Sequence, residues 1–115
     1  MTRLPIKKTY KLYIGGACPR SESGRTFEAQ GHNVARASRK DLRDAVRAAR
    51  TAQPKWAGAT AYNRGQVLYR LAEMMEARVT DLAALCSGTD EVECSIDRIV
   101  WYAGWADKLA QALGS

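Results

Sequence analysis

The chain has 115 residues, a length typical of one domain with a modest hydrophobic core. Apolar residues make up 46% of it and charged residues 26%, as in ordinary soluble globular proteins. No apolar run approaches the roughly 20 residues that a membrane-spanning helix needs, and the first residues lack the apolar stretch of a secretory signal. We therefore expect a cytoplasmic protein with no membrane attachment.

The net charge of +6 is unevenly distributed along the chain. Residues 1–55 carry thirteen Lys and Arg against four Asp and Glu, whereas residues 56–115 carry five against eight. Such asymmetry is typical either of a protein that binds an acidic partner, or of two halves that attract each other.

Strand and turn signals come first along the chain. "TYKLYIGG", residues 9–16, alternates in polarity and stops at two glycines. After a loop, "RTFEA" at residues 25–29 is typical of a second strand, and "QGHN" at residues 30–33 of another turn. We therefore expect a β-hairpin over residues 9–30.

Three helices are expected after this hairpin, over residues 38–53, 60–86 and 90–113. Each carries apolar residues at spacings of three and four, which place them on one face. The predicted fold class is therefore α/β, with an N-terminal β-hairpin followed by three α-helices in a single partial domain over residues 1–115.

Helix boundaries are predicted from capping and breaking residues. Ser38 followed by Asp41 is close to a capping box, with Asp in place of Glu. Pro54 predicts the end of the first helix. Thr60 and Asp90 are the expected starts of the second and third.

The third helix carries two tryptophans on the face opposite its apolar stripe. At 100° per residue, Trp101 and Trp105 lie away from Val92, Ile96 and Ala103. A helix that is apolar on two faces normally lies between two layers. Either the N-terminal hairpin covers the tryptophans, or they form a surface for another chain or for a missing part of a larger fold, a role in which Trp is enriched.

The three cysteines do not suggest a metal or disulfide site. Cys18, Cys86 and Cys94 have no CxxC spacing, and His32 is the single histidine. Tetrahedral zinc needs four N or S ligands, so we expect no metal. A catalytic Cys18–His32 pair is a minor alternative, and Cys86 and Cys94 are expected to be core or subsurface residues.

Basic residues lie along one flank of the first predicted helix and indicate an alternative function, the binding of nucleic acid. This basic flank could track phosphates of a nucleic acid, although no aromatic residue is interleaved to stack on bases. A solvated face, or one that meets an acidic partner, is the other interpretation. The flank consists of Arg36, Arg39, Lys40, Arg43, Arg47 and Arg50.

The order of these segments resembles the N-terminal segment of the NAD(P)-dependent aldehyde dehydrogenase superfamily. The similarity covers nearly the whole chain and rests on the helix ending in "AQPKW", on the run "RGQVLYRLAEMMEAR" that begins at Arg64, and on "YAGWADKL" in the third helix. The chain departs from the family pattern in the short segment "EAQGHNVARA" and in "CSGTDEVECSID". It is therefore expected to be a shortened relative or an excerpt.

The resemblance implies a scaffold without the catalytic machinery. Family members oxidise aldehydes with a cysteine nucleophile, a glutamate base and an oxyanion-binding asparagine, and these positions lie beyond this chain. We therefore expect no catalytic, cofactor-binding or metal-binding residue here, although a full-length relative would use NAD or NADP. Arg64 is expected to be structural. The expected partner is a second copy or another aldehyde dehydrogenase subunit, which would bury Trp101 and Trp105.

Overall fold

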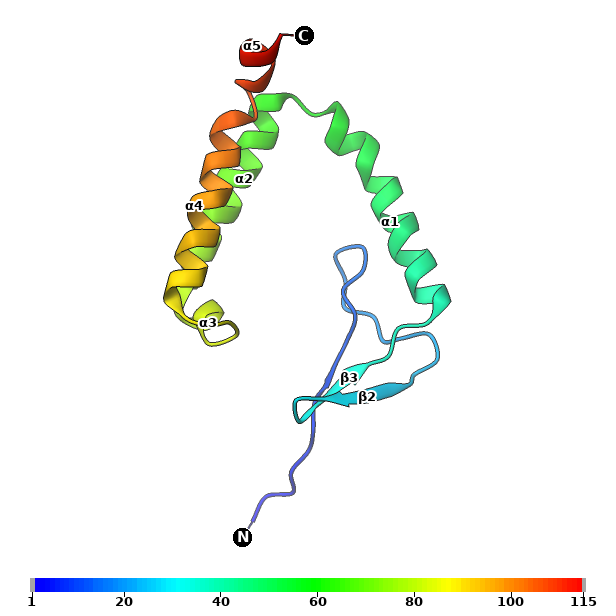
Figure 1. The fold of residues 1–115 in the computed structure, drawn as a ribbon. Helices are drawn as coiled ribbons and strands as arrows, with labels where there is room; N and C mark the ends of the chain where they lie inside the picture. The colour runs from blue at the N-terminus through cyan, green and yellow to red at the C-terminus, as the bar shows by residue number, and fades with distance from the viewer. Residues whose placement is uncertain (1, 115) are drawn as a thin grey trace. The chain divides into compact units, whose positions relative to one another are not determined.

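The computed structural model describes residues 2–114 (Figure 1). They divide into two compact units, Met1–Lys55 and Trp56–Ser115. The α/β class is confirmed, whereas the expectation of one partial domain over residues 1–115 stays a prediction. The elements in chain order are β1 (Thr9–Tyr10), β2 (Thr26–Ala29), β3 (His32–Ala35), α1 (Arg39–Gly58), α2 (Ala61–Glu76), α3 (Val79–Ala83), α4 (Thr89–Trp105) and α5 (Leu109–Leu113).

The first unit contains a small sheet with the strand order β1-β3-β2. β2 and β3 pair antiparallel, and β1 pairs with β3 in parallel. Gln30 and Gly31 connect β2 to β3 with φ angles of 50° and 77°. Two consecutive residues with positive φ are typical of a type I′ turn, whose twist matches that of the strands it joins. The hairpin therefore lies over β2 and β3.

The hairpin expected over residues 9–30 is wrong in its pairing. The glycines Gly15 and Gly16 do form a turn, with φ angles of 63° and 78°. However, the chain then doubles back on itself, because Ile14 and Ala17 exchange backbone hydrogen bonds of 3.0 and 3.1 Å. A two-residue turn brings its immediate neighbours together, so the first strand does not reach the second.

The start of α1 confirms the predicted cap. The Asp41 backbone N–H donates to the Ser38 hydroxyl at 3.3 Å, and the Ser38 N–H donates to the Asp41 carboxylate at 2.8 Å. The same carboxylate accepts from the Glu22 N–H at 3.0 Å. Asp41 is only 6% exposed. One aspartate therefore caps α1 and also fixes the loop that precedes β2.

α1 ends later than predicted, at Gly58 instead of residue 53, and includes Pro54. A proline inside a helix removes one backbone donor, but the helix continues for another turn. The Arg64 guanidinium donates to the carbonyl oxygens of Ala57 and Ala59, which satisfies acceptors that a helix end leaves without partners. The structural role expected for Arg64 is consistent with these contacts.

The second unit is built on two antiparallel helices, α2 and α4, which lie side by side (Figure 1). Its core consists of Ala72 from α2 and of Val92 and Ile96 from α4. The partly buried side chains packed against this core are Met75, Val79, Leu82, Ala83 and Ile99. The apolar stripes predicted from sequence therefore meet each other.

The second and third predicted helices are each divided in two. Arg78 leaves the helical region, with φ −126° and ψ 25°, and separates α2 from α3. A tighter turn bond, from the Lys108 N–H to the Trp105 carbonyl at 3.1 Å, separates α4 from α5. Periodicity continues through both breaks because a short turn preserves the apolar spacing, so the pattern alone predicts one long helix in each case.

Candidate functional site

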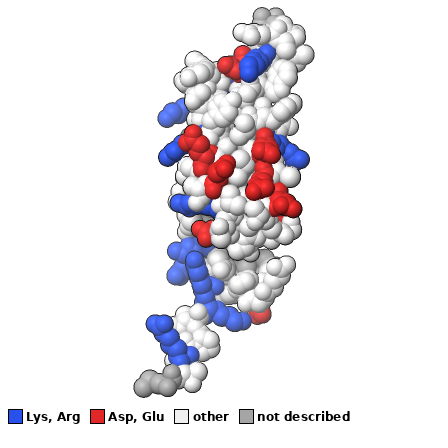
Figure 2. Space-filling model, turned by 90° about the vertical axis from the view of Figure 1, so that its left-hand side faces the viewer, with Lys and Arg blue, Asp and Glu red and all other residues white. Residues whose placement is uncertain are grey.

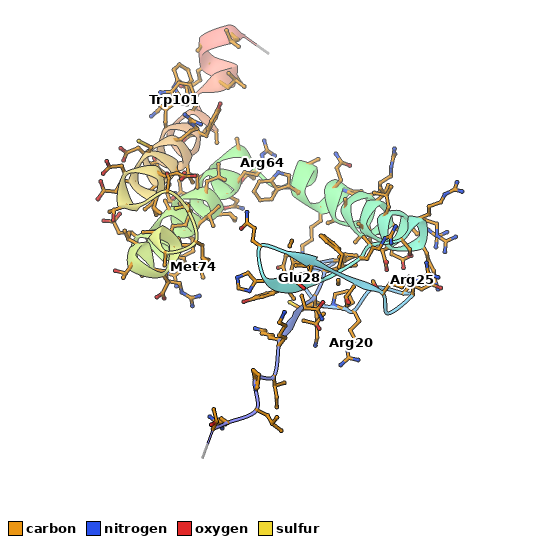
Figure 3. All side chains as sticks on the ribbon, turned by 60° about the horizontal axis from the view of Figure 1, so that its bottom comes forward. Arg20, Arg25, Glu28, Arg64, Met74 and Trp101 are labelled. Atoms are coloured by element: carbon orange, nitrogen blue, oxygen red, sulfur yellow. The ribbon has the colours of Figure 1, made fainter. Side chains whose placement is uncertain are left out.

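The orientation of α4 is determined by the core of the second unit. Val92, Ile96 and Ala103 are 3–6% exposed and face α2. Residues two positions apart in a helix point in nearly opposite directions. Trp101 and Trp105, each two residues from the buried Ala103, therefore lie on the outer face of α4. Figure 3 shows Trp101 on this outer side.

The outer face of α4 presents a cluster of aromatic rings. The centroids of Trp101 and Tyr102 are 5.0 Å apart at an angle of 87°, and those of Trp101 and Trp105 are 5.9 Å apart. These are favourable edge-to-face and tilted arrangements. Trp101 is 58% exposed, Tyr102 57% and Trp105 39%. Both predicted interface tryptophans are therefore accessible.

An apolar groove of about 360 Å³ continues this cluster into α5. We call its large side chains the tryptophan patch. The patch consists of Trp101, Tyr102, Trp105, Leu109 and Leu113. The sequence prediction did not include Leu109 of α5, although its spacing of four residues from Trp105, which itself follows Trp101 by four, indicates that the three side chains share one helix face. Leu113, at the end of α5, is 78% exposed, and no residue of α5 is buried.

Acidic side chains gather at the start of α4, and Figure 2 shows negative charge over this helix. The Ser87 hydroxyl and N–H both donate to the Glu91 carboxylate. These hydrogen bonds, the hydroxyl one first, hold the pKa of Glu91 below its ordinary value. Negative charge here also complements the helix dipole. The cluster is therefore explained as a helix start, although the N-cap residue of α4 is Gly88 and not the expected Asp90.

The basic flank is exposed along α1, but it is not entirely helical. Arg36 precedes α1, and its N–H donates to the Arg25 carbonyl at 2.8 Å. Lys40 forms a weak ion pair with Glu22 at 3.6 Å. The members on α1 are Arg39, Lys40, Arg43, Arg47 and Arg50.

The cysteines do not form a site. Cys86 and Cys94 are exposed, so the prediction that they are core or subsurface residues is wrong. Within residues 2–114, no hydrogen bond joins Cys18 to His32, and the His32 ring instead packs edge-to-face on Tyr10 at 5.5 Å. The same residues contain no group of three side chains that could hold a metal ion.

The glycine turns at Gly15–Gly16 and at Gly31 lie in the first unit and do not open a helix. A dinucleotide cofactor is usually held where a glycine-rich turn opens a helix, so that the helix N-terminus faces the pyrophosphate. The turn at Gly15 and Gly16 leads back into an antiparallel bridge at Ala17, and the turn at Gly31 leads into β3. Neither of these two turns therefore opens a helix, whereas the glycine that does, Gly88 at the start of α4, is followed by acidic residues in the first turn.

The fold and the site define a class of protein: a small α/β chain with an exposed aromatic face on α4. The sequence model of the aldehyde dehydrogenase family matches residues 26–113. The chain belongs to the aldehyde dehydrogenase family, and it matches the N-terminal part of these enzymes.

Individual relatives agree with this assignment. The chain is 32% identical to DhaS of Bacillus subtilis (strain 168), a provisionally assigned aldehyde dehydrogenase, over 90% of this chain and 25% of that protein. It is 30% identical to the mitochondrial 10-formyltetrahydrofolate dehydrogenase of Mus musculus, over 92% of this chain and 14% of that one. The crystal structure of an NAD-dependent aldehyde dehydrogenase from Sinorhizobium meliloti superposes with a TM-score of 0.77 at 26% identity, over 89% of this chain and 24% of that one.

The chain thus spans about a quarter or less of the length of these relatives. The alternative of a nucleic-acid-binding protein that uses the basic flank finds no support among them. No helix among residues 2–114 is both long enough and apolar enough to cross a bilayer.

Proposed function

We propose that this chain supplies the opening scaffold of an aldehyde dehydrogenase fold, and that it does not oxidise aldehydes by itself. The tryptophan patch is the surface by which it docks on another polypeptide, either a second copy or another aldehyde dehydrogenase subunit. The observation that carries this proposal is the exposure of the three aromatic side chains of α4 around an apolar groove.

Aromatic groups of this size favour association when they are removed from water. Burial of apolar surface contributes roughly 25 cal/mol per Å², and Trp and Tyr are the residues most enriched at energetically dominant interface positions. Trp101, Tyr102 and Trp105 lie on one face and are joined by ring contacts. A partner that covers them would therefore gain a contiguous apolar contact.

The absence of activity follows from the requirements of the chemistry. Thiol-based oxidation of an aldehyde needs an activated nucleophile, a general base and an oxyanion site together. Cys18, Cys86 and Cys94 are exposed and form no such constellation with one another among residues 2–114. We expect NAD or NADP to be bound by a full-length relative and not by this chain alone. The three exposed thiols also fit a reducing, cytoplasmic compartment.

Two measurements test these points. Light scattering after size-exclusion chromatography should show self-association, or a complex when a full-length aldehyde dehydrogenase subunit is added. A monomer in both cases would remove the docking role. NADH formation from a panel of aldehydes should stay at background, whereas a rate that thiol blocking abolishes would show that the chain is itself an enzyme.

A further inference from the structure

A second hollow lies on the first unit and has a different chemistry from the tryptophan patch. It has a volume of about 360 Å³ and lies between β1, the end of β3 and the loop that precedes β2. We call it the basic pocket. Its four cationic side chains are Lys7, Lys11, Arg20 and Arg25. Hydroxyl groups of Thr9, Ser21 and Thr26 also line it. Figure 3 shows Arg20 and Arg25 on that loop.

The charge of this pocket is only weakly compensated. No carboxylate lines it. Lys7 pairs with Glu28 at 3.8 Å, but both side chains are about two-thirds exposed, so the pair is worth little. Within residues 2–114, Lys11, Arg20 and Arg25 have no carboxylate within 4.0 Å. Several like charges that converge on one hollow produce a positive potential that attracts an anion.

The loop that carries the two arginines is fixed by hydrogen bonds. The Ser21 hydroxyl donates to the Arg25 carbonyl at 3.2 Å, and the Arg36 N–H donates to the same oxygen at 2.8 Å. The Glu22 N–H donates to the buried Asp41 carboxylate. Ser21 itself is 6% exposed. The guanidinium groups are therefore held on a preorganised backbone, which lowers the entropic cost of binding.

We propose that the basic pocket binds a small phosphorylated compound, with two adjacent phosphate groups as the recognised feature. An Arg guanidinium can donate two parallel hydrogen bonds to phosphate oxygens, and a Lys ammonium adds a compact positive charge. A hollow of about 360 Å³ is large enough for a compact polyanion. This site is separate from the tryptophan patch, so it does not depend on the proposed docking function.

Calorimetric titration with inorganic pyrophosphate tests the proposal. We expect saturable one-to-one binding that weakens as salt is added, because partly exposed charges are screened. The double variant Lys11→Gln/Arg20→Gln should weaken binding by about tenfold or more, since charge-assisted contacts are the strong ones. Circular dichroism confirms that each variant is folded.

A matched control separates the pocket from the overall positive charge. Arg43→Gln/Arg47→Gln removes the same charge from α1 and should change the affinity by less than about twofold. Equal losses in both double variants, or no saturation with pyrophosphate, would overturn the proposal. Equal binding of citrate would overturn the phosphate assignment. Equal binding of ADP would support it and identify a nucleotide diphosphate as a source of the ligand, whereas binding of pyrophosphate alone would identify the free anion.

Discussion

Gly65 of α2 lies directly against the backbone of Ala103 in α4. A Cβ atom built on Gly65 would be 3.0 Å from the Ala103 carbonyl oxygen and 3.6 Å from the Ala106 Cβ. Gly65 is buried, and the Ala103 carbonyl belongs to a helical backbone that cannot move independently. The absence of a side chain at this position therefore allows the two helices of the second unit to pack closely.

The substitution Gly65→Ala is expected to destabilise the second unit. Alanine favours a helix over glycine by up to about 1 kcal/mol, but overpacking against backbone costs about 1–3 kcal/mol. We expect the overpacking to exceed the propensity gain, with a lower midpoint in urea unfolding followed by circular dichroism. Gly104→Ala is the matched control, because its Cβ would meet only the Tyr69 hydroxyl at 3.6 Å, an ordinary contact. This variant should be as stable as the parent or more so, and destabilisation of both to the same extent would contradict the explanation.

The stability of the first unit should fall in acid because of Asp41. The Ser38 N–H, the largest contribution, and the Glu22 N–H and Ser38 hydroxyl donate to its carboxylate and hold its pKa below the ordinary value. The ionised form therefore stabilises the fold above the unfolded-state pKa of about 3.9, and this contribution is lost as the pH falls through the lower folded-state pKa. Unfolding midpoints between pH 7 and pH 2 should show this decline.

The variant Asp41→Asn should lower the unfolding midpoint at neutral pH and flatten the acid decline. An amide has only one oxygen to accept the donors that the carboxylate now satisfies. Asp44→Asn is the control, since Asp44 lies on the same helix and forms no ion pair within residues 2–114. If stability falls by the same amount in acid in the Asp41→Asn variant, another group must cause the fall. One such group is Glu91, whose pKa is also lowered.

The end of α1 should depend on Arg64. Its guanidinium donates to the carbonyl oxygens of Ala57 and Ala59, and hydrogen bonds of charged groups contribute about 1.5–3 kcal/mol. Because Arg64 is partly exposed, we expect Arg64→Met to cost about 1 kcal/mol. Amide hydrogen exchange should show increased opening near residues 56–60. Arg70→Met, which removes an exposed pair with Glu73, should have little effect. Similar exchange in all three proteins would show that Arg64 does not hold this end.

The docking role of the tryptophan patch is tested by substituting tryptophans inside and outside the patch and comparing the association constants. Trp101→Ser/Trp105→Ser should weaken the association constant by about a hundredfold or more, because a dominant interface residue contributes about 2 kcal/mol or more. Trp56→Ser is the control, since Trp56 is 45% exposed and lies outside the patch. Sedimentation equilibrium of the three proteins measures the constants. Association that is unchanged in the double variant would place the interface elsewhere.

Much of the local structure could be predicted from residues close in sequence. The Ser38–Asp41 cap, the Thr60 cap, which accepts from the Asn63 N–H at 3.2 Å, and the buried stripe at Val92 and Ile96 all depend on spacings of three or four. The family assignment rested likewise on contiguous segments. These features could be predicted because a helix turn brings such residues together wherever the rest of the chain lies.

What only the tertiary structure decided depends on residues far apart in the chain. Strand periodicity cannot choose a partner, so the pairing of β1 with β3 was missed. The exposure of Trp101 depends on what packs against α4. The basic pocket combines Lys7 with Arg25, which no local pattern connects. Spacing along the sequence determines which side chains share an element, whereas long-range packing determines which elements meet and which surfaces remain open to a partner.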